Sequence, residues 1–217
     1  MIIIGITGGV GAGKSTVLDY LEKKYGAQVI QADKAGHLVM EPDGICYDAV
    51  TALFGKEVIK NDKTIDRRRI SDVVFSHPEM LEKLNAIIHP AVRTYICGQL
   101  EEAARRGEPL LVVEAALLLE ENYQDFCDEV WYVHADKEIR VSRLMENRGY
   151  TRQKSEDIIA RQASEEFFRT HTDYEVDNGG SLEETYKQID NGIEKFERKF
   201  GRKLPNLTIK RGECADI

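Results

Sequence analysis

The chain lacks the features that mark membrane, disulfide-rich or general nucleic-acid-binding proteins. Its four cysteines lie far apart and form no C-x-x-C pair, so neither a zinc site nor a disulfide framework is indicated. The first residues show neither a basic n-region nor a cleavage site, and the apolar run at residues 2–6 is far too short to span a bilayer. Positive charge is also scarce: 30 Lys and Arg against 38 Asp and Glu leave a net charge of −8. That balance argues against general binding of nucleic acid or membrane surfaces, and the cytoplasm is the expected compartment.

The remaining composition is typical of a globular enzyme. With 217 residues, 42% of them hydrophobic and 31% charged, the chain can form one α/β domain with a sizeable core and an inserted or lid segment. Because the net charge is negative, an anionic substrate must meet a local basic patch.

Residues 8–15 read Gly-Gly-Val-Gly-Ala-Gly-Lys-Ser and match the phosphate-loop pattern G-x-x-x-x-G-K-[ST]. An apolar run precedes them and an amphipathic stretch at 16–25 follows, which predicts strand, glycine-rich turn and helix. In such a loop backbone N–H groups cradle phosphate oxygens, and the helix dipole adds positive charge. Lys14 can then reach the β- and γ-phosphates of a nucleotide, and Ser15 can hold Mg²⁺. The dinucleotide pattern G-x-G-x-x-G fails, because Lys14 occupies the third glycine position.

Apolar runs and helical periodicity predict a three-layer α/β fold with a mainly parallel sheet. Further strands are expected at 27–31, 110–114, 130–134 and near 174–176, and helices at 34–40, 137–147, 154–163 and from a capping box at Ser181 and Glu184 to about 200. Residues 47–107 are expected to be helical, with breaks at 61–63, 77–78 and 89–90. Ligands of parallel α/β sheets bind at the carboxyl ends of the strands.

Asp33 follows the second expected strand, nineteen positions after Lys14. Its carboxylate can accept a proton from an attacking hydroxyl or hold Mg²⁺ through water. The alternative is an N-cap for a helix that begins at Lys34. We favour the catalytic role, because the phosphate loop also lies at the carboxyl end of a strand.

Arginines concentrate in two places. Asp66-Arg67-Arg68-Arg69 begins a helix, and three cations in a first turn oppose its dipole, which favours an anionic partner over a solvated helix end. His89-Pro90 is equally compatible with a ligand contact and a helix break. Five more arginines follow the fourth expected strand, where one or two can close over a phosphoryl group while most form a charged helix surface: Arg140, Arg143, Arg148, Arg152 and Arg161.

Three other nucleotide-binding classes can be weighed against these residues. A GTPase is excluded, because no N-K-x-D occurs and the D-x-x-G at residues 33–36 comes too soon after the loop. A kinase for a nucleoside, nucleotide or shikimate-like substrate would share the loop and Asp33, but leaves the long helical segment unexplained. A non-enzymatic nucleotide-binding module would keep Lys14 and could dispense with Asp33.

Taken together, the motifs over residues 1 to about 200 resemble those of the dephospho-CoA kinases. They are, in chain order, Thr7 to Thr16, Ala32-Asp33, Ile65-Asp66-Arg67, Val74-Phe75, Leu84-Asn85 with His89-Pro90, Leu117-Leu118 with Glu120, Arg143-Leu144, Gln162, and Asp173 through Asp177-Asn178. The phosphate loop alone is generic, whereas the ordered set is much more specific. Four positions depart from the family pattern: Gln31, Ala116, Asn147 beside Arg148, and Ile158.

The resemblance implies ATP-dependent phosphorylation of the ribose 3′-hydroxyl of dephospho-CoA with Mg²⁺. It also implies a core at about 1–45, 108–136 and 170–200, a CoA-binding helical segment at 46–107, a lid at 137–169, and a flexible tail at 201–217. Asp33, Lys14 and Arg143 or Arg148 are then expected to be catalytic, and Asp33, Arg67 and His89 to contact dephospho-CoA. The nucleotide is expected to contact Gly11, Ala12, Gly13, Lys14, Ser15, Thr16 and Asn178, with Ser15 also on the metal.

Overall fold

The computed structural model describes residues 1–205, and the remainder of the expected tail lies outside that range. The strands are β1 (Ile2–Thr7), β2 (Gln28–Gln31), β3 (Leu110–Glu114), β4 (Glu129–His134) and β5 (Tyr174–Asp177). The helices are α1 (Lys14–Tyr25), α2 (Ala32–Leu38), α3 (Tyr47–Phe54), α4 (Arg67–Ser76), α5 (Pro78–Arg106), α6 (Lys137–Arg148), α7 (Arg152–Ala160), α8 (Glu165–His171) and α9 (Leu182–Phe200), with short 3₁₀ turns η1 (Lys56–Val58) and η2 (Tyr123–Phe126). The chain forms two compact units, residues 30–102 and the segments on either side of them.

The strands of the described residues form one sheet in the order β2-β3-β1-β4-β5. β1 pairs in parallel with β3 and β4, and β4 pairs in parallel with β5, which confirms the expected mainly parallel sheet. The register sets Ile6 opposite Glu114 on one side and Trp131 on the other. The carboxyl end of β1, where the phosphate loop begins, therefore lies beside the end of β3.

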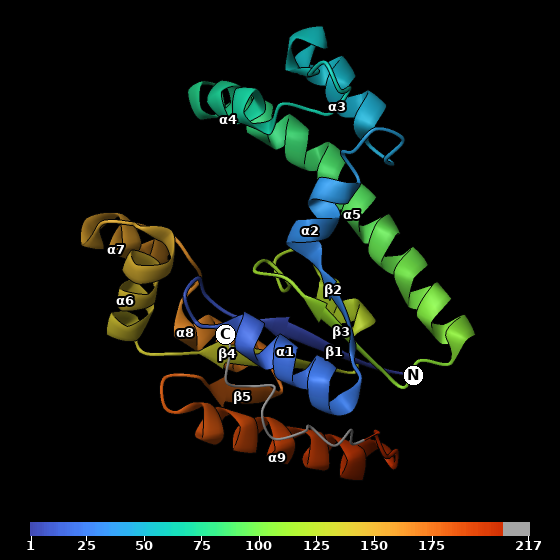
Figure 1. The fold of residues 1–217 in the computed structure, drawn as a ribbon, viewed down its shortest axis with the longest axis vertical. Coiled ribbons are helices and arrows are strands. Elements are labelled where there is room, and N and C mark those ends of the chain that lie inside the picture. Colours follow the sequence, from blue (N-terminus) through green and yellow to red (C-terminus); the bar gives the residue numbers. More distant parts are fainter. Residues whose placement is uncertain (206–217) are drawn as a thin grey trace. The chain divides into compact units, whose positions relative to one another are not determined.

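Helices α1 and α9 pack together on one face of this sheet, as Figure 1 shows. Their buried side chains join apolar residues of β1, β3 and β4 in one core, which also contains Leu204 from beyond the last helix. On the opposite face Tyr132 of β4 stacks on Phe168 of α8 with ring centroids 4.8 Å apart. Both faces of the central strands are thus covered, which is typical of a parallel sheet and explains their continuous apolar runs.

The unit at residues 30–102 contains α2, α3, α4 and most of α5. The expected break at His89-Pro90 is wrong, because Pro90 lies inside α5, a single helix of 29 residues. A proline inside a helix costs about 3 kcal/mol. Burial of side chains on both sides of it, among them Leu84, Val92 and Ile96, offsets that cost.

Candidate functional site

The phosphate loop has the backbone conformation that its glycines predict. Gly11 and Gly13 have φ angles of 77° and 84°, in the left-handed region that favours glycine. Gly13 is the N-cap of α1, and Lys14 and Ser15 are that helix's first two residues. Successive backbone N–H groups therefore lead into a helix N-terminus, which is a ready anion-binding arrangement.

Lys14 is oriented by two oxygens at the carboxyl ends of the interior strands β1 and β3. Its Nζ donates to the carbonyl of Gly8 at 2.9 Å and lies 3.6 Å from Oε1 of Glu114. Glu114 is the last residue of β3 and is 6% exposed. Sequence reasoning assigned no role to Glu114, although an acid that ends an apolar strand beside a phosphate loop is a recognisable signal.

The hydroxyl of Thr7, which ends β1, is also buried, and it has no hydrogen-bond partner among residues 1–205. Ser15 lies exposed one residue beyond Lys14.

Arg143 and Asn178 hold the second half of the loop from outside. Arg143 donates to the carbonyls of Gly11 at 3.4 Å and Ala12 at 3.3 Å, and to the Asn178 carbonyl at 2.7 Å. The Asn178 side chain is buried, donates to the Ala12 carbonyl at 2.9 Å, and accepts a bond from the Thr185 hydroxyl at 3.0 Å. Both side chains thus position the loop backbone.

Three other arginines of the α6–α7 hairpin, Arg140, Arg148 and Arg152, have different environments. Arg152 pairs with Glu138 at 3.0 Å and with Glu156 at 3.2 Å, which confirms the charged-surface interpretation for this residue. Arg148, at the end of α6, is exposed. Arg140 is not on the surface: it is 8% exposed and contacts the phosphate loop.

Asp33 is the second residue of α2, whose N-cap is Gln31. The N-cap interpretation of Asp33 is therefore wrong, because the helix begins at Ala32 and not at Lys34. The Asp33 side chain is exposed and makes no hydrogen bond within residues 1–205. One turn later, burial and the nearby Arg67 cation lower the pKa of His37, while the Asp33 carboxylate opposes that shift. Asp33, His37 and Arg67 therefore share one electrostatic environment.

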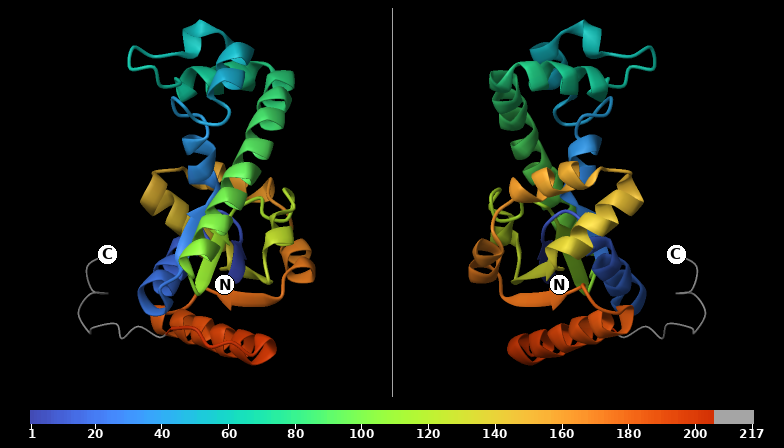
Figure 2. Two further views of the ribbon diagram at one scale, coloured as in Figure 1. Left: turned by 90° about the vertical axis from the view of Figure 1, so that its right-hand side faces the viewer. Right: turned by 90° about the vertical axis from the view of Figure 1, so that its left-hand side faces the viewer.

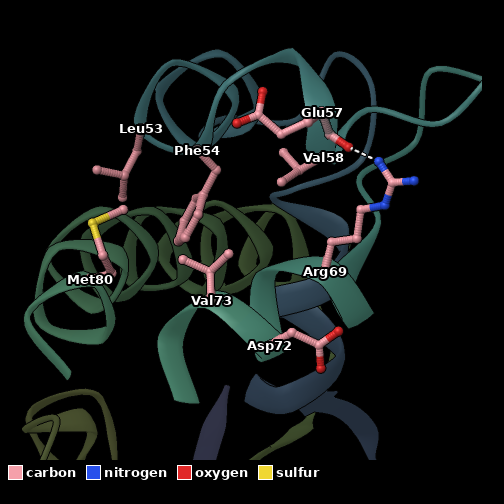
Figure 3. A pocket seen from close by; sticks show the side chains of 8 residues that line it. All are labelled: Leu53, Phe54, Glu57, Val58, Arg69, Asp72, Val73 and Met80. Carbon is pink, nitrogen blue, oxygen red and sulfur yellow. Dashed lines mark hydrogen bonds between the residues drawn. The ribbon is translucent and has the colours of Figure 1, made fainter. Parts of the chain in front are cut away.

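The cations at the start of α4 differ in their partners. Asp66 caps the helix by accepting bonds from the backbone of Arg68 and Arg69. Arg69 also donates to the carbonyl of Glu57, beside a 380 Å³ cavity lined mainly by apolar side chains of α3, η1, α4 and α5 (Figure 3). Arg67 is exposed, and no hydrogen bond of its side chain is found in the described part of the chain. His89 lies half-buried within α5.

Comparisons with known proteins agree with the family resemblance of the sequence motifs. The family model described as "Dephospho-CoA kinase" matches residues 2–184. A dephospho-CoA kinase of Oceanobacillus iheyensis is 36% identical over 196 residues, which cover 90% of this chain and 98% of that protein. A dephospho-CoA kinase of Geobacter metallireducens is 36% identical over 189 residues, 87% of this chain and 94% of that one.

Solved structures agree with this result. TT1252 from Thermus thermophilus superposes with a TM-score of 0.76 and 32% identity, over 90% of this chain and 97% of that one. A dephospho-CoA kinase from Campylobacter jejuni, 21% identical, shares the fold with a TM-score of 0.69 over 91% of this chain and 98% of its own. No helix within residues 1–205 is long and apolar enough to cross a membrane. With the phosphate loop intact and the family model covering most of its length, this chain belongs to the dephospho-CoA kinase family.

Proposed function

We propose that this protein transfers the γ-phosphoryl group of ATP to the ribose 3′-hydroxyl of dephospho-CoA, the last step of coenzyme A synthesis. The observation that carries the proposal is the family match over residues 2–184, together with a phosphate loop in which Lys14 is held by the Gly8 carbonyl at the carboxyl end of β1. Catalysis of phosphoryl transfer rests mainly on positioning and on charge stabilisation. The loop residues from Gly11 to Thr16 and the Lys14 ammonium supply both.

Mg²⁺ fits the polar groups at the base of the loop. Ser15 can offer its hydroxyl, and the buried carboxylate of Glu114 can hold a water of the ion's shell. Within residues 1–205 no cluster of three His, Cys, Asp or Glu side chains could hold a metal alone, so the ATP phosphates would complete the shell. When bound, the ion neutralises charge on the β- and γ-phosphate oxygens.

Asp33 is the proposed acceptor of the ribose hydroxyl proton. It follows β2, it is exposed, and no hydrogen bond within the described residues occupies its carboxylate. Arg67, in the same electrostatic environment, suits the phosphate groups of dephospho-CoA. We place His89 on the same substrate by its position in the family motif.

Arg148 is the better candidate for the arginine that closes over the phosphoryl group. Arg143 already donates to three backbone carbonyls, whereas Arg148 is exposed at the end of α6. Asn178 contributes to ATP binding by donating to the Ala12 carbonyl and so fixing the loop backbone.

A substrate panel tests the proposal. Purified protein with Mg·ATP is offered dephospho-CoA, nucleosides, nucleotides and shikimate, and ADP release is measured. Dephospho-CoA should be phosphorylated at the 3′ position with a kcat/KM at least about 100-fold above any other acceptor. A nucleotide or shikimate as the better acceptor would instead assign the chain to another small-molecule kinase activity.

A further inference from the structure

Arg140 is a buried cation without a carboxylate partner. Its side chain comes from the first turn of α6, is 8% exposed, and has no acid within 4.0 Å among residues 1–205. Burial lowers the pKa of its guanidinium, while Tyr132 and then Glu165 oppose that shift. Burying a charge without an ion-pair partner is costly, so the contacts that Arg140 does make require an explanation.

Those contacts go to Val10 of the phosphate loop and to Gln162, which itself contacts Val10. Arg140 Nε donates to the Val10 carbonyl at 2.9 Å, and its Nη2 donates to Oε1 of Gln162 at 2.6 Å. The same Gln162 oxygen accepts the Val10 backbone N–H at 3.0 Å. Val10 is thus held at both its N–H and its carbonyl by a pair of side chains, the Arg140–Gln162 clamp.

The clamp acts on a tight turn at the start of the loop. The Ala12 N–H bonds to the Gly9 carbonyl at 3.2 Å, which makes Val10 and Gly11 the central residues of a β-turn. Because Gln162 occupies the Val10 N–H, that group is not available to a phosphate. The clamp therefore leaves phosphate binding to other N–H groups of the loop, and it fixes the turn that leads to the start of α1.

The backbone of Gly9 lies directly against the side chains of Arg140 and Gln162. A Cβ at Gly9 would overlap the Arg140 guanidinium and would lie 2.9 Å from Oε1 of Gln162. Arg140 and Gln162 also flank the α6–α7 hairpin, which Figure 2 shows in gold: Arg140 lies near its beginning and Gln162 lies just after its end. The hairpin is thereby connected to the phosphate loop at both of its ends.

We infer that Arg140 and Gln162 are positioning residues that preorganise the phosphate loop for the ATP phosphates through the backbone of Val10. The inference rests on the proposed ATP-dependent reaction for its kinetic readout. ATP binding measured by calorimetry without an acceptor tests it independently of dephospho-CoA.

Arg140→Met should weaken ATP binding at least about tenfold and raise the KM for ATP to a similar extent, with the KM for dephospho-CoA changed less than twofold. Gln162→Met should act in the same direction. The double variant should lose no more than the worse single variant, because the two side chains bond to each other and hold the same residue, Val10. Gln162→Glu keeps the acceptor oxygen and should restore ATP binding to near the wild-type value. Arg152→Met, which removes a surface cation of the same hairpin, is the matched control and should leave both constants unchanged.

Gly9→Ala provides a variant that keeps both clamp side chains. The new methyl group should displace Arg140 and reproduce the ATP effect, and in the Arg140→Met background it should add little. The inference is overturned if these variants lower the melting temperature while the KM for ATP stays within twofold, since that is a purely structural role. An equal rise in both KM values, or a Gln162→Glu variant as impaired as Gln162→Met, would overturn it as well.

Discussion

Replacing Asp33 with asparagine removes a carboxylate and very little else. The residue is the second of α2, and its side chain neither caps the helix nor accepts a hydrogen bond within the described residues. Asp48 provides a matched control, because it is exposed and is the second residue of α3 in the same unit. Asp48→Asn therefore removes the same favourable interaction with a helix dipole but no proposed catalytic group.

The expected magnitudes differ widely between stability and turnover. An acidic residue in a first helical turn contributes about 0.3–1 kcal/mol, so both variants should melt within about 4 °C of the wild type. Loss of a general base costs about 10²–10⁴-fold in turnover, which corresponds to about 3–5 kcal/mol of barrier. Asp33→Asn should show that loss in single-turnover phosphorylation of dephospho-CoA, and Asp48→Asn should not.

Histidine titration adds a readout that is independent of activity. The Asp33 carboxylate partly opposes the lowering of the His37 pKa, so Asp33→Asn should lower that pKa further in an NMR titration. The reasoning fails if a normally folded Asp33→Asn protein, with the His37 shift present, retains turnover within about threefold of the wild type.

Three further predictions concern the loop, the acceptor and alkaline stability. Lys14→Ala should nearly abolish phosphoryl transfer, because it removes a cation that stabilises the negative charge developing on the phosphoryl group in the transition state. Steady-state activity within about tenfold of wild type would contradict this. Arg67→Ala should weaken dephospho-CoA more than ATP in calorimetric titrations, and a loss confined to ATP would move Arg67 to the nucleotide site. Burial raises the pKa of Cys127 from 9.0 to about 12, so the unfolded chain loses this proton first and stability falls as pH rises from 9 to 12. At pH 10.5 that loss is about 2 kcal/mol relative to pH 8, and Cys127→Ala should not show it in urea titrations; an unchanged pH dependence would be the contrary result.

Local sequence signals predicted the elements that depend on local chemistry. The phosphate-loop pattern correctly placed a strand, a glycine turn and a helix, and Gly13 has the positive φ that such a turn requires. Ser181 and Glu184 form the expected capping box, with the Glu184 N–H donating to the serine hydroxyl oxygen at 3.3 Å. The phosphate-loop pattern spans residues 8–15 and the capping box residues 181–184, so a short window of sequence contains the necessary information for each.

Two predictions from local sequence failed: the break at Pro90 and the start of α2. One helix, α8, was not predicted. Pro90 lies inside α5, because buried neighbours on both sides hold the helix together. α2 begins at Ala32 and not at Lys34, which places Asp33 in its first turn and rules out the alternative role of Asp33 as N-cap. α8 was not expected, although Ser164 caps it by accepting the Phe167 N–H at 3.1 Å and acidic residues follow in its first turn.

The sequence by itself determined the fold class, the phosphate loop and the family, because hydrophobic periodicity, a contiguous loop pattern and an ordered set of motifs can be identified along the chain without knowledge of tertiary contacts. Only the tertiary structure decided which distant side chains serve that loop. Glu114 lies beside Lys14 because β3 pairs with β1 in one particular register, 100 residues along the chain. Likewise, Gly9 must be small because Arg140, 131 positions later, lies against its backbone. Strand register and helix packing bring these residues together, and no local spacing encodes that contact.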